Sequence, residues 1–157
     1  MTRILKYSII VLLTLLIYSC DSSRVYEENI PVDNYIWERN NISTFTANIN
    51  DTKSAHNVYI NIRNSGSYEF NNVYLFITIA SPSGTVAKDT FECILADDRG
   101  KWYGSGIGDI FHLQIPYKIN IFFPDTGNYV FEFEQAMRVE KLQGISDIGL
   151  RIEKSNK

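Results

Sequence analysis

The sequence predicts an all-β fold: a single-domain antiparallel β-sandwich with a jelly-roll or immunoglobulin-like Greek-key topology. Apolar residues recur mostly at every second position, which places alternate side chains on one face of a strand. The 157 residues include 10 Tyr and 9 Phe but only 2 Met, and aromatic residues favour strands. Turn-forming residues separate the short apolar segments, without a helical stretch long enough to connect parallel strands. The strands are therefore expected to pair antiparallel.

Composition and charge exclude several classes of protein. The chain has 15 basic and 18 acidic side chains, for a formal charge of -3, and it therefore lacks the basic surface that nucleic-acid binding requires. Hydrophobic residues make up 45% of the chain, which is too much for a disordered protein and enough for one packed core. No nucleic-acid partner is expected, and no motif indicates a cofactor.

Residues 1–19 have the pattern of a signal peptide. Arg3 and Lys6 precede an apolar run from Tyr7 to Tyr18, which is shorter than the roughly 20 residues of a membrane-spanning helix. A basic start followed by a short apolar run is typical of a segment that is removed after export. We therefore expect the mature chain to begin after residue 19.

Cys20 is the candidate lipid-attachment residue. The string Ile17-Tyr18-Ser19-Cys20 resembles a bacterial lipobox, in which the cysteine becomes the first mature residue and carries acyl chains. Two or three acyl chains anchor a protein stably, whereas one anchors it marginally. The alternative is an incidental thiol, after an ordinary signal peptide or within an uncleaved anchor. On the lipobox interpretation, residues 20–30 form the lipidated cysteine and a short tether, and residues 31–157 form the sandwich domain.

The mature chain is predicted to form one helical turn followed by a series of strands. Asp33 to Arg39 is expected to form a helical turn, with Asp33 as its N-cap. Seven strand segments are identified by their alternating apolar residues, which are Phe45 to Ile49, Val58 to Ile62, Val73 to Ile79, Phe91 to Leu95, Ile119 to Phe123, Tyr129 to Phe133 and Ile148 to Ile152. Turns rich in Gly, Pro or Asn separate them at residues 64–67, 81–84, 124–128 and 143–144.

Cys93 lies within one of these strand segments. If Cys20 carries lipid, Cys93 has no partner for an internal disulfide, so the core alone must stabilise the exported domain. A cysteine between apolar residues on a strand is typically a small buried side chain. We expect Cys93 to be such a core residue.

The segment from Asp97 to Ile110 holds four of the nine glycines. It lacks the following helix of a dinucleotide-binding loop and the spacing of a hydrolase nucleophile elbow. Its aspartates also lack the spacing of a calcium loop, so no metal is expected. We interpret the segment as a long shaped loop, whose glycines permit close backbone approach. Its candidate partner- or ligand-facing residues are Asp97, Asp98, Arg99, Lys101, Trp102, Tyr103 and Asp109.

Other chemically capable residues have structural interpretations. His56 and His112 have no neighbouring His or Cys at ligand spacing, so each is expected to be a polar strand residue. Glu132 and Glu134 are two positions apart, which places both on the water-facing side of one strand. Three aromatic residues remain as a possible sugar-stacking platform, namely Trp37, Trp102 and Tyr103.

Two strings carry a resemblance to a known family. The first runs from Leu95 to Ile110 and continues with Ile115-Pro116-Tyr117, and the second comprises Phe131 to Arg138 followed by Leu142 to Glu153. Together with the lipobox and the overall length, they resemble the gliding-motility lipoprotein GldH family of Bacteroidetes. The resemblance implies a membrane-attached lipoprotein associated with the gliding apparatus, and it carries over no catalytic residue.

We therefore expect a non-enzymatic assembly or interaction component of the cell envelope. Its expected partners are the membrane, through the N-terminal lipid, and other envelope or gliding-apparatus proteins. We expect anchoring in the outer membrane, on the periplasmic face, in preference to the inner membrane. The alternative is a carbohydrate-binding β-sandwich lipoprotein, in which Trp102, Tyr103 and Trp37 stack on sugar rings.

Overall fold

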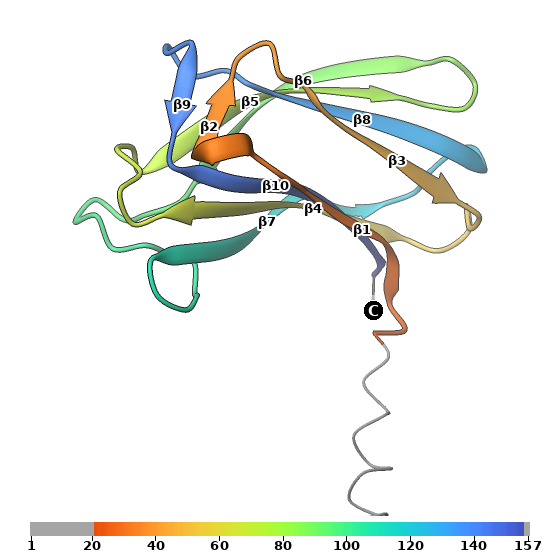
Figure 1. The fold of residues 1–157 in the computed structure, drawn as a ribbon. Helices are drawn as coiled ribbons and strands as arrows, with labels where there is room; N and C mark the ends of the chain where they lie inside the picture. Colours follow the sequence, from red (N-terminus) through yellow and green to blue (C-terminus); the bar gives the residue numbers. More distant parts are fainter. Residues whose placement is uncertain (1–20, 156–157) are drawn as a thin grey trace, which may run out of the picture.

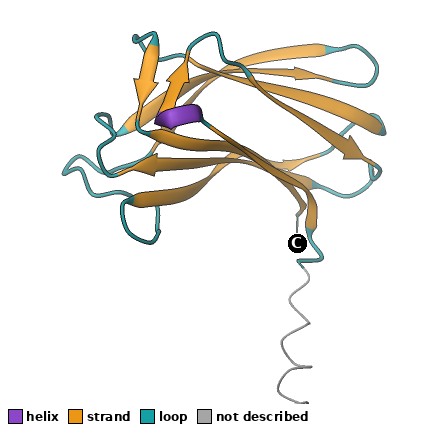
Figure 2. Ribbon diagram, viewed as in Figure 1, coloured by secondary structure: helices purple, strands orange, loops and turns teal. Residues whose placement is uncertain are grey.

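The structure is a computed structural model that describes residues 21–155. The signal peptide and Cys20 lie outside the described residues. Within 21–155, the chain forms ten strands and one short 3-10 helix (Figures 1 and 2). In chain order these are β1 (Arg24–Pro31), η1 (Asp33–Tyr35), β2 (Ile36–Glu38), β3 (Ser43–Ile49), β4 (His56–Ser65), β5 (Asn72–Ala80), β6 (Val86–Ile94), β7 (Ile110–Ile121), β8 (Gly127–Gln135), β9 (Lys141–Gln143) and β10 (Ile145–Lys154).

Two four-stranded antiparallel sheets face each other, which confirms the predicted sandwich (Figure 2). Their strand orders are β1-β10-β4-β7 and β3-β8-β5-β6, and β2 pairs with β9 in a separate two-stranded sheet. The pairs are nested along the chain: β1 with β10, β3 with β8, β4 with β7 and β5 with β6. Such nesting folds one long antiparallel ribbon into two sheets, which is the jelly-roll arrangement. The topology is therefore a jelly roll and not an immunoglobulin-like one.

The core lies between the two sheets, and alternating residues of each strand supply it. In β3 every second residue is buried, as the sequence predicts. The Phe45 and Phe133 rings lie 5.1 Å apart in the core, and complete burial of such a side chain contributes roughly 1.5–3 kcal/mol. Cys93 is fully buried, which confirms its prediction, and burial raises the pKa of its thiol to about 12.

The expected tether at residues 20–30 is wrong over most of its length. Arg24–Pro31 forms β1, which pairs with β10 along its whole extent. Residues 24–30 therefore belong to the domain. The local sequence of β1 has little apolar alternation, because the strand lies at a sheet edge and is held largely by backbone hydrogen bonds and ion pairs. Those partners lie near the other end of the chain.

The helical turn expected from Asp33 to Arg39 is shorter than predicted and is capped differently. Only Asp33–Tyr35 is helical, and Val32 occupies the N-cap position without a side-chain cap bond. Ile36–Glu38 instead forms β2, in which Trp37 pairs with Leu142. Trp37 is 1% exposed, and its ring nitrogen donates a 2.8 Å hydrogen bond to the Asn41 carbonyl oxygen. Burial of this large side chain outweighs local helix formation.

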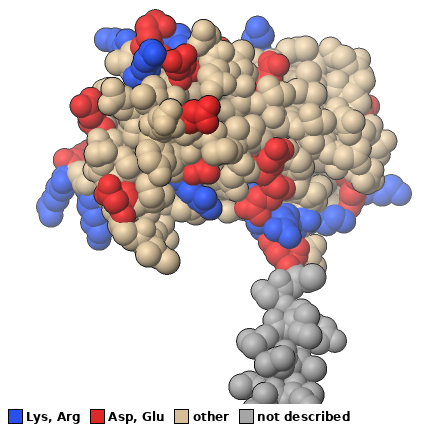
Figure 3. Space-filling model, in the orientation of Figure 1, with Lys and Arg blue, Asp and Glu red and all other residues tan. Residues whose placement is uncertain are grey.

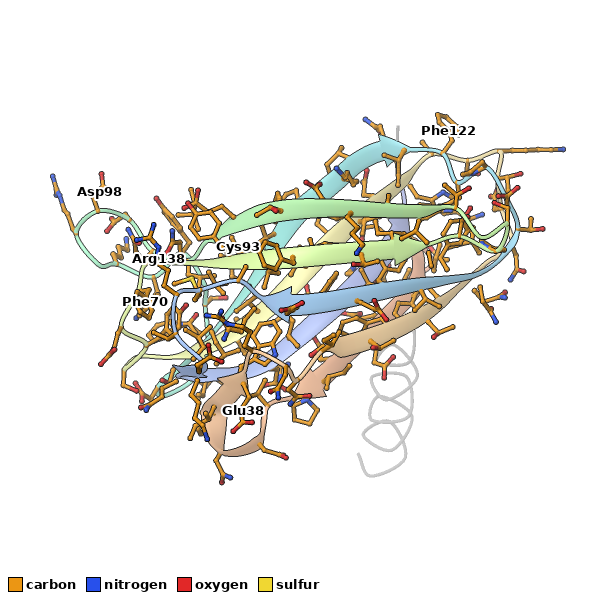
Figure 4. The ribbon with its side chains drawn as sticks, turned by 90° about the horizontal axis from the view of Figure 1, so that it is seen from above. Glu38, Phe70, Cys93, Asp98, Phe122 and Arg138 are labelled. Carbon is orange, nitrogen blue, oxygen red and sulfur yellow. The ribbon has the colours of Figure 1, made fainter. Side chains whose placement is uncertain are left out.

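The sandwich has two different ends. The described chain begins and finishes at one of them, which we call the terminal end, together with the loops at residues 50–55, 81–85 and 122–126. The opposite end, which we call the loop end, carries the loops at residues 66–71, 95–109 and 136–140, of which 95–109 is the longest. Figure 4 shows Phe122 at the terminal end, and Asp98, Phe70 and Arg138 at the loop end. The expected partner-facing segment thus lies opposite the point where the chain enters the domain.

Candidate functional site at the loop end

The segment expected to face a partner begins with a tight turn built around Asp97. The Asp97 amide donates to the Lys101 carbonyl oxygen over 3.0 Å. The Asp97 carboxylate accepts hydrogen bonds of 2.9 Å from the amides of both Arg99 and Lys101. Gly100 has a φ of +79°, a conformation that favours glycine. The Asp97 side chain therefore stabilises the turn, and the following residues Asp98 and Arg99 are exposed to solvent.

A second turn follows between Ser105 and His112. These two residues exchange backbone hydrogen bonds of 3.1 and 2.9 Å. A side chain at Gly106 would clash with the Ile110 carbonyl oxygen, and one at Gly104 would lie 2.8 Å from the carbonyl oxygen of His112. These two glycines are thus required by close backbone approach, as expected from the sequence. The next element is strand β7, so nothing here forms a phosphate-binding helix terminus.

Trp102 attaches this segment to the domain. Its ring centroid lies 6.3 Å from that of Tyr68 and 5.8 Å from that of Phe111. The predicted sugar-stacking platform is therefore wrong: Trp37 is in the core, Trp102 is half-buried against other rings, and only Tyr103, at 59%, is exposed. Three rings that face different surroundings do not present one flat surface to a pyranose.

The exposed part of the loop end combines charge with apolar side chains. Asp98, Arg99 and Lys101 are exposed, and none of them forms an ion pair with another residue of 21–155. Asp109 is also exposed, and its carbonyl oxygen accepts a 2.8 Å hydrogen bond from the Gly66 amide. Ile107, which no motif in the sequence marks, is 96% exposed at the tip of the second turn.

Two surface grooves flank the Asp97 turn. One, of about 520 Å³, runs along the 66–71 loop to Trp102, and its rim includes Glu69 and Asp98. The other, of about 360 Å³, lies between Glu92, Ile94 and Tyr103. Both grooves form because residues 66–72 come next to residues 96–103 in the folded chain, as the hydrogen bonds from the amides of Leu95 and Ala96 to the Asn71 carbonyl oxygen show. A local sequence pattern does not reveal this adjacency.

A third hollow, of about 450 Å³, is more apolar and was also missed. It is lined by Phe70, Tyr74, Ala136, Met137, Arg138 and Val139. Fully buried Gln135 supports its 136–140 loop: the side-chain nitrogen donates to the Val139 carbonyl oxygen over 2.9 Å, and the side-chain oxygen accepts from the Met137 amide over 3.0 Å. Arg39 adds a 2.8 Å hydrogen bond to the Met137 carbonyl oxygen. The loop is therefore held in one shape before any partner arrives.

The histidines and the glutamate pair do not converge on a reactive site. His56 and His112 lie near opposite ends of the β4–β7 pair, where they pair with Ile121 and Arg63 respectively. Burial lowers the pKa of both imidazoles, and the Arg63 guanidinium lowers that of His112 further. Glu132 and Glu134 alternate with the buried residues of β8 and face outward, as predicted. Among residues 21–155, no group of three or more His, Cys, Asp and Glu side chains is arranged to hold a metal ion.

The part of the chain that the structure describes contains no helix that is both long and apolar enough to cross a membrane.

Comparisons with known proteins identify relatives of the whole domain. The GldH lipoprotein family matches residues 24–152. The gliding motility lipoprotein GldH homolog of Christiangramia forsetii is 35% identical over 149 residues, which cover 90% of this chain and 91% of that protein. The gliding motility lipoprotein GldH of Flavobacterium johnsoniae is 34% identical over 161 residues, which cover 98% and 99% of the two chains.

Similarity to solved structures is more distant. The CBM35 from Cellvibrio japonicus Abf62 has 12% identity and a TM-score of 0.31, with 88% of this chain and 94% of that chain covered. A chain of infectious bursal disease virus Gx strain has 16% identity and a TM-score of 0.29, with 85% and 32% covered. TM-scores this low support no argument about function.

Proposed function

Because this chain belongs to the GldH lipoprotein family, we propose that it is a non-enzymatic component of the gliding-motility system that binds an envelope protein through its loop end. The two relatives compared above carry gliding motility in their names, and they align with nearly the whole chain. Family membership implies a lipoprotein of the cell envelope. The role in assembly and the location of the contact surface are our proposals.

Anchoring would proceed through Cys20. Removal of residues 1–19 leaves this cysteine as the first residue, and acylation would place the domain at the membrane surface. Confinement to a membrane raises the effective concentration of any partner in the same membrane, so modest contacts suffice for association. We propose the outer membrane, on its periplasmic face, as the site of anchoring.

The observation that carries the proposed contact surface is the position of the loop end. It lies at the opposite end of the strands from Asp21, the first described residue (Figures 1 and 4). A lipid at residue 20 would thus leave the loops at residues 95–109 and 136–140 free to reach a partner. Exposed Tyr103 and Ile107, together with the unpaired charges of Arg99 and Lys101, give this end the mixture of apolar and charged groups typical of a binding surface.

A non-enzymatic role agrees with the chemistry of the described residues. In the part of the chain that the structure describes, the exposed carboxylates of Asp98 and Asp109 form no side-chain hydrogen bond or ion pair that would orient them toward a reacting group. Asp97, the carboxylate with the most hydrogen bonds there, is occupied by the amides of its own turn. The features of this end are those of a preformed contact surface.

A substitution experiment in the native bacterium tests the proposal. Tyr103→Ser and Ile107→Ser remove the two most exposed apolar side chains of the loop end, and neither side chain contributes to the core. Phe76→Ser is the matched control, because Phe76 is 49% exposed in the middle of β5, away from both ends of the sandwich. We expect the double variant to lose colony spreading and the crosslink to an envelope partner at normal protein level. Unchanged spreading and crosslinking would rule out the loop end as the contact surface.

A further inference from the structure

The chain enters the sandwich without a free tether. The Asp21 carboxylate forms an ion pair with Arg151, and the Lys154 amide donates a 2.8 Å hydrogen bond to the Ser23 carbonyl oxygen. The Arg151 side chain is only 13% exposed and is held in turn by Glu27 at 2.7 Å and Glu153 at 2.9 Å. Figure 3 shows this group of charged side chains where the described chain begins. Residue 21 is therefore attached to the sheet, and Cys20 is the residue before it.

The same end of the molecule exposes two large apolar side chains. Phe122, which is 61% exposed, directly follows Ile121, the last residue of β7, and Ile119, which is 47% exposed, lies two residues before Ile121. The register runs across the sheet from Lys154 of β10 to His56 of β4 and from there to Ile121 of β7. Strands lie about 4.8 Å apart, so the end of β7 is roughly 14 Å from β1 at the same level of the sheet. A surface that touches the entry point can also touch Phe122.

The neighbouring residues hold this apolar tip in place. Phe123 is buried, with its ring 4.8 Å from Tyr129 and 5.3 Å from His56. Asn120 has a φ of +55°, and its amide donates a 3.0 Å hydrogen bond to the Asn57 side-chain oxygen. With Phe123 fixed inward, Phe122 projects outward (Figure 4). The exposure of Phe122 is therefore built into the turn.

We propose that the terminal end of the sandwich rests on a lipid bilayer, with Phe122 and Ile119 inserted among the lipids beside the acylated Cys20. This inference rests on the proposed acylation of Cys20, and it adds a second, apolar contact with the membrane. Removal of these side chains from water favours insertion. Because both contacts lie at one end, the domain stands on the bilayer instead of moving freely at the end of a tether.

Two lysines around the tip are paired within the domain, whereas Lys53 of the 50–55 loop is exposed without an ion pair among residues 21–155, so we expect the contact to be mainly apolar. Lys118 is paired with Asp89 at 3.0 Å, and Lys154 is paired with Asp51 at 2.8 Å. These cations are neutralised within the domain, so they offer little attraction to anionic headgroups. We therefore expect the membrane contact to persist at high salt concentration, which weakens contacts between exposed charges.

Such an orientation determines where a partner can bind. Strand β7 has 12 residues, and at about 3.3 Å per residue it spans roughly 40 Å from the terminal end to the loop end. The loop end would then be presented at about this height above the bilayer surface. The partner site would therefore lie well beyond the headgroups.

Site-directed labelling of the full acylated chain tests the inference. Phe122→Cys carries an environment-sensitive fluorophore, and Ile107→Cys at the loop end is the matched control. Native Cys93 is fully buried, and its thiol is therefore protected from labelling. The proteins are reconstituted in vesicles of phosphatidylethanolamine and phosphatidylglycerol with or without brominated lipid. We expect bromine to quench the label at position 122 about threefold or more, to leave the label at position 107 unchanged, and to act equally at high salt.

Each other outcome overturns the inference in a distinguishable way. In one outcome, the measured mass includes the acyl chains, but quenching is weak and equal at both positions. This result would contradict the bilayer contact and would leave the proposed function in place. Protection of position 122 in native membranes, without quenching in the lipid vesicles, shows that a protein covers the tip. An intact mass without acyl chains removes both the inference and the proposed anchoring.

Discussion

Gln135 offers the most direct test of how the loop end is held in shape. Its side chain is fully buried and satisfies two backbone groups of the 136–140 loop, the Met137 amide and the Val139 carbonyl oxygen. Gln135→Met preserves the volume of the side chain but removes both hydrogen bonds. The Met137 amide is left buried without a partner, which costs about 1–3 kcal/mol. The Val139 carbonyl oxygen loses one donor but keeps the 3.3 Å hydrogen bond from Arg39, which adds roughly 0.5–1.5 kcal/mol. We expect the free energy of unfolding to fall by about 2–3 kcal/mol.

The assay is urea denaturation of the chain, combined with hydrogen exchange of individual amides. For a domain of this size, 2–3 kcal/mol corresponds to a decrease in melting temperature of about 6–12 °C. The amide of Met137 should exchange faster than amides in the centres of β8 and β10. Gln143→Met is the matched control, because Gln143 is exposed on β9 and forms no side-chain hydrogen bond in the described chain. A destabilisation below about 0.5 kcal/mol, or unchanged exchange at Met137, would refute the support of this loop by Gln135.

Three further predictions concern the core, the buried histidine and the anchor. Phe133→Ala should cost about 3–5 kcal/mol, measured by urea denaturation, because the ring is fully buried between the sheets. Burial lowers the pKa of His56 below 6.5, so the unfolded chain binds the proton more readily: stability should be constant above pH 6.5 and fall as the pH decreases from there toward the folded-state pKa. Melting temperatures of His56→Phe should fall less over this range, with the remaining slope from His112, and an identical slope would contradict the assignment. Cys20→Ala should move the protein from the membrane to the soluble fraction, and retention in the membrane would disprove lipid anchoring through this residue.

The fold class was predictable because it depends on local alternation. In β3, β4, β5, β8 and β10 the structure buries the predicted apolar residues, except Ile79 at the end of β5, which is partly buried. Each of these strands has one face toward the core, so apolar and polar residues alternate along its sequence. Prediction failed at β1, β2 and β9, which are an edge strand and two three-residue strands whose formation depends on distant partners. It also failed at β7, because the expected segment from Ile119 to Phe123 overlaps only the end of the strand at Ile110–Ile121, and Ile119 is exposed.

The candidate site was predictable only in part, for a related reason. The glycines and charges of residues 97–110 indicated a shaped loop, and the structure shows the close approaches that require Gly104 and Gly106. The apolar hollow lined by Arg138 was not predicted, because its walls come from three separate segments of the chain. The loop that forms one wall is also held by a hydrogen bond from Arg39 to the Met137 carbonyl oxygen, and these two residues are 98 positions apart in the sequence. Trp102 was misjudged as a surface ring, since the positions of Tyr68 and Phe111 follow only from the folded chain.

By itself, the sequence determined that this protein is an all-β domain of the GldH lipoprotein type, preceded by a segment with signal-peptide and lipobox character. Periodicity and short motifs are properties of short sequence segments, and they can be recognised without knowledge of the tertiary structure. Only the tertiary structure decided on the jelly-roll pairing, the absence of a tether between Asp21 and the sheet, and the separation of the apolar tip from the loop end. These features depend on contacts between segments far apart in the sequence. Such contacts form, and stabilise the fold, only when the two sheets pack together.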